Sequence, residues 1–404
     1  MTLAKPLELP CGAMLPNRIA KAAMSEQLAT VTGRPTPAHV RLYDTWARSG
    51  CGLIVTGNVI VDRSAVSEPR QVVLEDERDI ETLRTWASAA RADGAHCWMQ
   101  LNHAGRQIPR TLSGRPVAPS AQEMTSLRGG FARPRTLTAS EIGELIQRFA
   151  RSAEIAVRAG FDGVQIHAAH GYLISQFLSP LTNQRDDAWG GDAERRRRFL
   201  LAVIDAVRGA VGPKVPVAVK LNSSDFQRGG FDEDESMAVV DSLGDAGVDL
   251  LEISGGTFES TAMMTGAGES TRAREAYFLD YAERVRARAR MPLMLTGGLR
   301  SAAGMQAALQ SGAIDVCGLA RPLVLEPDIA QRFLASDETV STAVPRRGRI
   351  PRLAGAAETI WYTEQIHRIS RGRTPKPGRS VETSMARYLL ASTRDALVRR
   401  VLVR

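Results

Sequence analysis

The stretch GFDGVQIHAAHGYLISQFLSPLTNQRDDAWGG, residues 160–191, decides the fold and points to the site. Residues 162–166 are bounded by glycines and follow a strong helical pattern, which predicts a short buried parallel strand. His167, His170 and Tyr172 come where that strand ends. Each of them alone could be a structural residue, a satisfied histidine or a rim aromatic. Together at one strand end, they predict a functional site.

Short apolar runs alternate with helical patterns along the chain, which is typical of repeated βα units and a parallel sheet. Eight strands are predicted, at residues 18–24, 52–56, 95–101, 162–166, 215–221, 248–253, 292–296 and 314–319. Helices are predicted between them at 80–92, 139–159, 193–211, 233–246, 276–289 and 302–310. Eight such units close a barrel, so we predict an α/β fold of the (β/α)₈ TIM-barrel type, with its function at the C-terminal strand ends.

Three segments stand outside this alternation. Residues 7–16 predict a hairpin that closes the bottom of the barrel. Residues 103–137, rich in Gly, Pro, Ser and Arg, form an insertion after the third strand, and its length there predicts a lid. After residue 338 the pattern changes to basic linkers and helices at 356–370 and 385–403. We therefore predict a barrel over residues 1–338 and a basic helical extension over 339–404.

The charge of the chain is concentrated in this extension. The whole chain of 404 residues carries +8, but residues 341–404 hold 14 basic and four acidic side chains, which leaves −2 for the rest. A barrel so nearly neutral gives no electrostatic support for nucleic-acid binding. The extension is interpreted first as helices packed on the barrel or on a partner subunit. A role at a membrane surface or on a polyanion, and partial disorder, are the alternatives.

The four cysteines show no Cys-x-x-Cys spacing and are interpreted as small hydrophobic residues, without a disulfide, metal or iron–sulfur role. The first ten residues have no apolar signal region, and no apolar run approaches the ~20 residues that span a bilayer. We expect a soluble cytoplasmic protein without a membrane partner.

Residues 160–191 resemble the signature of the Old Yellow Enzyme family of FMN-dependent NAD(P)H:flavin oxidoreductases. The shared features are His-x-x-His-Gly-Tyr-Leu, then Gln-Phe-Leu-Ser-Pro-x-x-Asn-x-Arg-x-Asp, and Gly-Gly before an Arg-rich helix start. The resemblance extends over about residues 5 to 335. It implies a TIM barrel that holds one FMN without a covalent bond and takes its hydride from NADH or NADPH.

The resemblance implies flavin contacts at the first three strand ends. The backbone at Ala23 and Met24 would contact the isoalloxazine, and the Ser25 hydroxyl would replace a Thr or Cys that tunes the ring through O4. Asn58 stands where relatives often have Ala or Gly, so it adds a hydrogen bond to the ring or only fills space. The Gln100 carboxamide offers a donor and an acceptor that match the pyrimidine edge.

The later strand ends supply a cation and a phosphate site. Lys220 would stabilise the negative charge of reduced flavin near N1 and O2, although an ion pair in the barrel mouth is the alternative. Gly297 and Gly298 allow close approach of the backbone to a phosphate, and the next strand ends at Ala320 and Arg321, where Arg321 can fork onto phosphate oxygens. No Gly-x-Gly-x-x-Gly opens a helix after a strand, so this is no Rossmann site.

His167 and His170 are spaced as metal ligands could be, but no third ligand accompanies them, and no metal is predicted. The resemblance implies instead that they bind an electron-withdrawing oxygen of the substrate above the flavin. Their hydrogen bonds would stabilise the developing enolate. Tyr172 would then be the proton donor to the α-carbon.

The chain departs from the family pattern at three places. Gln27 stands where several relatives have an active-site Tyr, and its amide could donate a hydrogen bond in place of the phenol. Glu194-Arg195 replaces the commoner Glu-Asn. No cysteine follows Cys317, so we expect none of the internal electron transfer found in the dienoyl-CoA reductase branch.

The predicted function is an FMN-dependent ene-reductase. It would transfer a hydride from NAD(P)H through the flavin to the C=C bond of an activated alkene such as an α,β-unsaturated carbonyl compound. The alternatives are a flavin-binding protein without turnover, an NAD(P)H oxidase with another acceptor, and a non-redox barrel lyase or isomerase that uses Lys220 as a Schiff-base nucleophile. The Arg-rich extension also permits a homo-oligomer.

Overall fold

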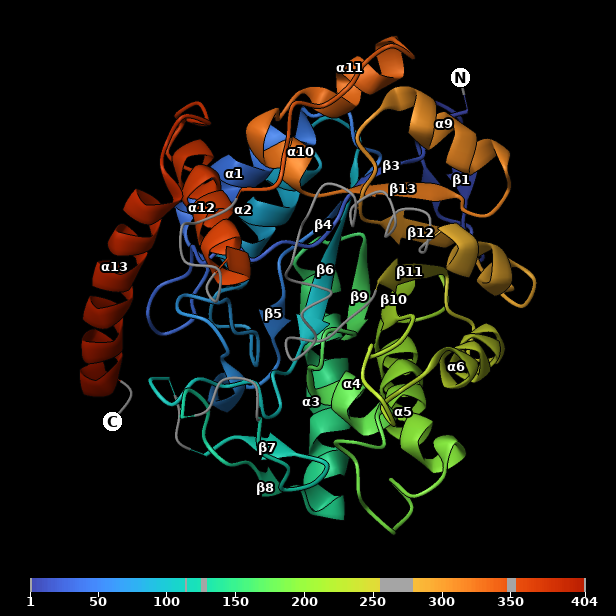
Figure 1. Ribbon diagram of the computed structural model, residues 1–404, viewed down its shortest axis with the longest axis vertical. Helices are drawn as coiled ribbons and strands as arrows, with labels where there is room; N and C mark the ends of the chain where they lie inside the picture. The colour runs from blue at the N-terminus through green and yellow to red at the C-terminus, as the bar shows by residue number, and fades with distance from the viewer. Residues whose placement is uncertain (1, 113–114, 125–128, 255–278, 347–353, 403–404) are drawn as a thin grey trace.

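The computed structural model is a closed barrel of eight parallel strands surrounded by helices (Figure 1). It describes residues 2–112, 115–124, 129–254, 279–346 and 354–402. Around the barrel the strands follow one another as β4 (Leu53–Val55), β3 (Ile19–Lys21), β13 (Val316–Leu319), β12 (Leu293–Thr296), β11 (Leu250–Ser254), β10 (Val217–Asn222), β9 (Gly163–Ala168) and β6 (His96–Asn102). Pairing of β6 with β4 closes the circle, and the short β5 (Val59–Ile60) extends along β6. The predicted fold and all eight predicted strands are confirmed.

The helices between the strands match the predicted pattern. They are α2 (Ile80–Ala90), α3 (Ala139–Arg158), α5 (Ala193–Val211), α6 (Glu233–Asp245) and α9 (Ala302–Gln310). The predicted helix at 276–289 begins outside the described residues. Four of the helices in the described part of the chain were not predicted: α1 (Pro37–Ala47), α4 (Leu173–Leu178), α10 (Arg321–Leu325) and α11 (Ile329–Ala335). The start of α1 does carry a sequence signal, since Thr36 caps it and Pro37 is its first residue.

The lower half of the barrel interior is apolar. The antiparallel strands β1 (Leu7–Glu8) and β2 (Met14–Leu15) form the predicted hairpin. Its inward side chains share one buried cluster with barrel residues: Leu7, Leu9, Leu15, Ala20, Ala22, Leu53, Val55, Trp98, Ala218, Leu250, Met294 and Val316. The hairpin therefore closes the bottom of the barrel, and the inward polar side chains are left to the C-terminal half of the strands.

The insertion after β6 is folded where the structure describes it. It contains two short parallel strands, β7 (Val117–Ala118) and β8 (Arg135–Thr136). Arg185, in the loop after α4, donates to the carbonyl oxygens of Pro119 (3.0 Å) and Leu137 (2.6 Å). One guanidinium thus joins the middle and the C-terminal end of the insertion to the loop that follows α4.

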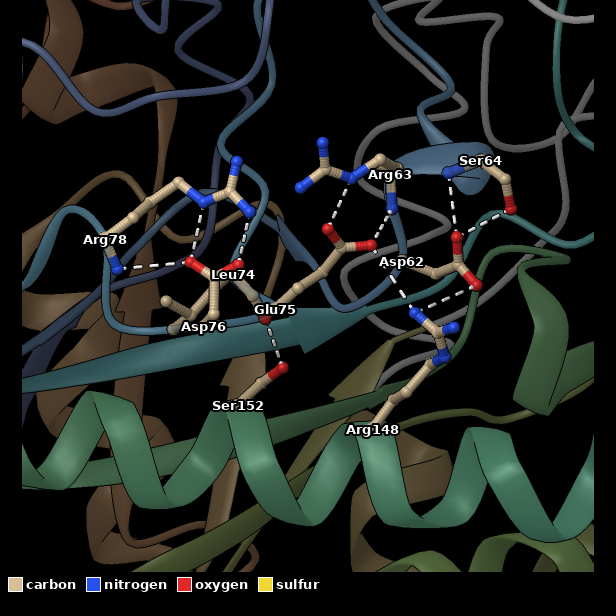
Figure 2. Close-up of polar contacts among 9 residues, drawn as sticks. All are labelled: Asp62, Arg63, Ser64, Leu74, Glu75, Asp76, Arg78, Arg148 and Ser152. Atoms are coloured by element: carbon tan, nitrogen blue, oxygen red, sulfur yellow. Dashed lines mark hydrogen bonds and ion pairs between the residues drawn. The ribbon is translucent and has the colours of Figure 1, made fainter.

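A second irregular segment joins β5 to α2 and comprises residues 61–79. Figure 2 shows it lying against α3. The Ser152 hydroxyl of α3 donates to the buried carbonyl of Leu74 at 2.5 Å. Arg148, one turn earlier, lies 3.6 Å from a carboxylate oxygen of Asp62 and 3.4 Å from one of Glu75. Exposed ion pairs contribute little each, but here they and the buried bond hold both flanks of the segment to one helix.

The basic extension forms the two predicted helices, α12 (Ala354–Ile369) and α13 (Val381–Leu402). Helix α12 contacts α1 and α10 on one side of the barrel (Figure 1). His367 at its end lies with Nε2 2.8 Å from the carbonyl oxygen of Glu26, and Asp395 of α13 forms a bidentate ion pair with Arg70. We propose that the chain divides near residue 338 into a barrel and this extension, which docks on the barrel beside the residues that follow β3.

Candidate functional site

Polar side chains replace apolar ones in the upper half of the barrel and form one hydrogen-bonded row. Gln100 of β6 donates to Oε1 of Gln165 at 2.7 Å, and Gln165 donates to Oε2 of Glu252 at 2.8 Å. Lys220 of β10 donates to the other carboxylate oxygen of Glu252, also at 2.8 Å. All four side chains are buried, Gln165 and Glu252 completely. Sequence reasoning missed Gln165 and Glu252, although a polar residue inside an apolar strand was the available signal.

The Lys220–Glu252 contact is the ion pair that was the alternative interpretation of Lys220. The carboxylate of Glu252 balances the ammonium charge inside the barrel, because burying a lysine charge without a counter-ion costs a large desolvation free energy. The register supports the contact, because residues 220 and 252 are direct partners in the β10–β11 ladder. A further contact of Lys220 with a flavin stays a prediction.

The histidine pair lies at the mouth of the barrel, as the spacing predicted. The ring of His167 stands 5.0 Å, centroid to centroid, from the rings of both His170 and Tyr172, edge to face in each case. His170 has a φ of 62°, which is unusual for a residue with a side chain. The backbone N–H of His170 donates to Oδ1 of Asn222 at 3.2 Å, and the ring Nε2 of His170 lies 2.7 Å from the Ser254 hydroxyl.

Both imidazoles are neutral at pH 7. Burial lowers the pKa of His167 and the pKa of His170 well below the usual value, and the Lys220 charge lowers them further. The N–H of Ala169 donates to Nδ1 of His167 at 3.2 Å, so the proton of the neutral ring resides on Nε2. Burial also raises the pKa of the Tyr172 phenol, which keeps its proton. The trio is therefore uncharged, with a donor at Nε2 of His167 and at the Tyr172 phenol, and His170 donates from Nδ1 when its Nε2 accepts from the Ser254 hydroxyl.

The segment after β3 lies on another side of the same mouth. Ser25 donates from its hydroxyl to Oε1 of Glu68 at 3.1 Å, and the Gln27 amide donates to Oε2 of Glu68 at 2.9 Å. Asn58 accepts from the Gln71 amide at 2.9 Å. Neither interpretation of Asn58 foresaw this bond to Gln71, and a hydrogen bond from Asn58 to the flavin ring stays a prediction. Sequence reasoning missed Glu68, which lies in an irregular segment without a periodic pattern.

The strand ends β12 and β13 carry the predicted phosphate residues. Gly297 and Gly298 have φ values of 137° and 79°, conformations that favour glycine. A side chain at Gly318 would meet the Thr296 hydroxyl at 2.0 Å, so the backbone of β13 lies close to β12. Arg321 lies 3.0 Å from a carboxylate oxygen of Glu358 in α12 and its side chain is 41% exposed. Its pairing with the extension was not foreseen.

Several buried polar atoms around this mouth find no hydrogen-bond partner among the described residues. They are the amide oxygen and nitrogen of Asn102 and the hydroxyl of Thr296, at the ends of β6 and β12. Buried polar groups are nearly always hydrogen-bonded, so a polar ligand would complete them. A flavin offers amide-like groups and a phosphate, and the residues present fit it.

Other chemistry has less support in the described part of the chain. That part contains no cluster of three or more His, Cys, Asp or Glu residues suited to a metal ion. All four cysteines are free, and Cys51, Cys97 and Cys317 are buried, as small hydrophobic residues are. Among the described helices, none has both the length and the apolar character for a membrane crossing.

The chain is similar to known proteins over most of its length. Residues 2–338 match the NADH:flavin oxidoreductase / NADH oxidase family. Two relatives named NADH-dependent flavin oxidoreductase iliE are 36% identical over 90% of the chain, in Neonectria sp. (strain DH2), and 37% identical over 82%, in Hypocrea jecorina. The matched region is 51% of the Neonectria protein and 89% of the Hypocrea protein.

Solved structures of Old Yellow Enzyme homologues are similar to this chain as well. The Old Yellow Enzyme homologue from Zymomonas mobilis is 26% identical, with a TM-score of 0.71 over 85% of this chain and 95% of that one. Morphinone reductase in complex with tetrahydroNAD is 25% identical, with the same TM-score over 84% and 92%. These matches cover the barrel and its strand ends, where the candidate site lies.

Proposed function

Because the chain belongs to the NADH:flavin oxidoreductase / NADH oxidase family, whose pattern spans its whole barrel, we propose that it is an FMN-dependent ene-reductase. Its substrates would be NADH or NADPH as hydride donor and an activated alkene, such as an α,β-unsaturated carbonyl compound, as acceptor. FMN, when bound, would supply the chemistry of hydride transfer between the nicotinamide and the alkene. The protein supplies binding, orientation and protons.

The residues proposed to hold the cofactor surround the barrel mouth. The backbone of Ala23 and Met24, the Ser25 hydroxyl, Gln100 and Lys220 would contact the ring, with Asn58 near its edge. Gly297, Gly298, Ala320 and Arg321 would contact the phosphate. The buried polar atoms of Asn102 and Thr296, which lack a hydrogen-bond partner in the part of the chain that the structure describes, support a polar ligand in this place.

The observation that carries the proposal is the neutral donor trio. His167 has its proton on Nε2 and, with His170, would donate hydrogen bonds to the carbonyl oxygen of an enone. These bonds strengthen as that oxygen gains negative charge, so they favour the transition state over the ground state. Tyr172 lies 5.0 Å from His167, ring to ring, and would give its phenolic proton to the α-carbon.

The test is anaerobic reduction of the purified protein by NADH and by NADPH, followed by mixing with cyclohexenone. Bleaching of the flavin absorbance and enone-dependent recovery are expected. Recovery with oxygen alone would favour an oxidase or another acceptor, and a flavin that is never reduced would favour a binding protein. A colourless protein would overturn the flavin assignment and return attention to a lyase or isomerase, against which the pairing of Lys220 with Glu252 speaks.

Tyr172→Phe is expected to lower the rate of flavin reoxidation by cyclohexenone by about 10²-fold, because a positioned general acid contributes roughly 10²–10⁴. Reduction of the flavin by NADH should change less than threefold, since that step needs no proton from the phenol. Stopped-flow absorbance measures both rates. An unchanged reoxidation rate would mean that solvent supplies the proton.

Arg321→Ala is expected to weaken FMN binding about tenfold or more, because it removes a charge-assisted contact to phosphate. The Kd follows from fluorescence of free flavin during dilution. Since Arg321 also pairs with Glu358, Glu358→Gln is the matched control: it breaks the same ion pair and should leave FMN bound. Equal losses in both variants would place the effect in docking of α12.

Two further inferences from the sequence stay predictions. A homo-oligomer through the extension is supported by exposed apolar side chains on α13, namely Leu389, Leu390 and Leu397. The second is a cytoplasmic location. The choice between NADH and NADPH is decided by the reduction experiment above.

A further inference from the structure

Glu68 is a partly buried carboxylate at the barrel mouth that the proposed mechanism does not use. It belongs to the segment between β5 and α2, whose flanks are held to α3 by Arg148 and Ser152 (Figure 2). The carboxylate accepts from two side chains only two positions apart, Ser25 at 3.1 Å and Gln27 at 2.9 Å. Both follow β3, in the stretch proposed to lie along the flavin.

The surroundings of Glu68 favour its protonated form. Burial raises its pKa above the usual value and the nearby Glu26 carboxylate raises it further, while the bonds from Gln27 and Ser25 act in the opposite direction. Two phenols also lie in its field, Tyr172 at the mouth and Tyr388 of α13, and Glu68 raises the pKa of each. The guanidinium of neighbouring Arg70 is engaged by Asp395 of α13.

Ser25 has a single hydroxyl hydrogen, and this limits what it can do. The ionised Glu68 carboxylate can only accept hydrogen bonds, so the Ser25 hydrogen is directed at it. The Ser25 oxygen then presents only lone pairs to any other neighbour. When the residue at position 68 can donate, the serine oxygen can accept from it. The Ser25 hydrogen is then free to point elsewhere.

We propose that Glu68 is a positioning residue that controls the hydrogen bond from Ser25 to the flavin O4 and thereby the reduction potential of the cofactor. The proposal rests on the proposed function, because it takes FMN to lie against Ser25. Ionised Glu68 withholds the Ser25 hydrogen and disfavours reduced flavin. Protonated Glu68 releases that hydrogen, and a donor at O4 stabilises the charge that gathers on the reduced ring.

The pH dependence follows from the raised pKa of Glu68. Above this pKa the carboxylate is ionised and the potential lies low. As pH falls through it, the potential gains an increment beyond that from proton uptake by the flavin itself. A variant with a neutral residue at position 68 should lack this increment, so its potential should differ from wild type at high pH and converge on it at low pH.

A double-mutant cycle tests the proposal, with wild type, Glu68→Gln, Ser25→Ala and the double variant, all loaded with FMN. Glutamine keeps the shape, accepts from Gln27 and can donate to Ser25. At pH 8, Glu68→Gln should shift the two-electron equilibrium toward reduced flavin about tenfold, which corresponds to about 30 mV. In the Ser25→Ala background the same change should shift it less than threefold. Dye-coupled anaerobic titration measures the midpoint potentials.

The controls separate the possible explanations. Glu75→Gln removes a carboxylate from the same segment, where it pairs with Arg63 and Arg148, and should leave the potential unchanged. Equal shifts from Glu68→Gln in both backgrounds would show that Glu68 acts through its charge alone and would overturn the proposal, as would no shift in either. Failure of the proposed function is seen separately, as wild-type protein without flavin.

A variant that loses FMN does not end the test. Wild type and Ser25→Ala are then compared from pH 5 to pH 9, with Glu68 intact in both. The proposal expects the difference between their potentials to change with pH as Glu68 titrates. A difference constant over this range would overturn it.

Discussion

Replacing both His167 and His170 with alanine is expected to lower kcat/KM for cyclohexenone reduction by at least about 10³-fold while FMN stays bound. One donor to a developing oxyanion in a water-poor site typically contributes 10²–10³. The two rings are neutral, and His167 has its proton on Nε2, so the loss is of hydrogen bonds rather than of charge. The flavin contacts come from other strand ends and should survive.

Two measurements check this expectation. Stopped-flow reoxidation by cyclohexenone gives the rate, and a phenol titration gives the charge-transfer band of a bound substrate analogue, which should vanish. His96→Ala is the matched control, since His96 begins β6 at the opposite end of the barrel and should have no effect on either. Asparagine at both positions keeps a donor and should recover part of the rate. Unchanged phenol binding in the alanine variant would show that the pair is structural.

Lys220→Met is expected to lower the free energy of unfolding by about 3–5 kcal/mol, because it leaves the carboxylate of Glu252 buried without its cation. Glu252 is fully buried, and among the described residues its other oxygen accepts only from the neutral amide of Gln165. Adding Glu252→Gln removes the uncompensated charge, so the double variant should regain most of the loss. The pair therefore makes each partner costly to remove alone.

Urea unfolding of the FMN-loaded proteins, followed by tryptophan fluorescence, measures these differences. Arg84→Met is the surface control, since it breaks an exposed pair with Glu81 and should change stability by less than about 1 kcal/mol. A Lys220→Met variant as stable as wild type would mean that Glu252 is protonated or solvated when the lysine is absent. A fall in midpoint potential in both the single and the double variant would support the flavin contact of Lys220.

Local patterns were sufficient for the barrel and for part of the site. Strand and helix periods depend on residues within one element, which is why α5 and α9 match their predicted bounds and why the closing hairpin and both extension helices were found. The histidine trio was found for the same reason, as three neighbours at one strand end. The short helices α4, α10 and α11 were missed because five to seven residues carry too little periodicity.

Tertiary structure decided what those side chains contact. Lys220 meets Glu252, Arg321 meets Glu358 and Ser25 meets Glu68 across separations of 32, 37 and 43 residues. Sequence alone, through composition and period, therefore determined an eight-stranded barrel with polar residues at its mouth. Closure of the barrel, strand register and the anchoring of the irregular segment to α3 decided which of them pair, because a hydrogen bond depends on positions in space that no local pattern specifies.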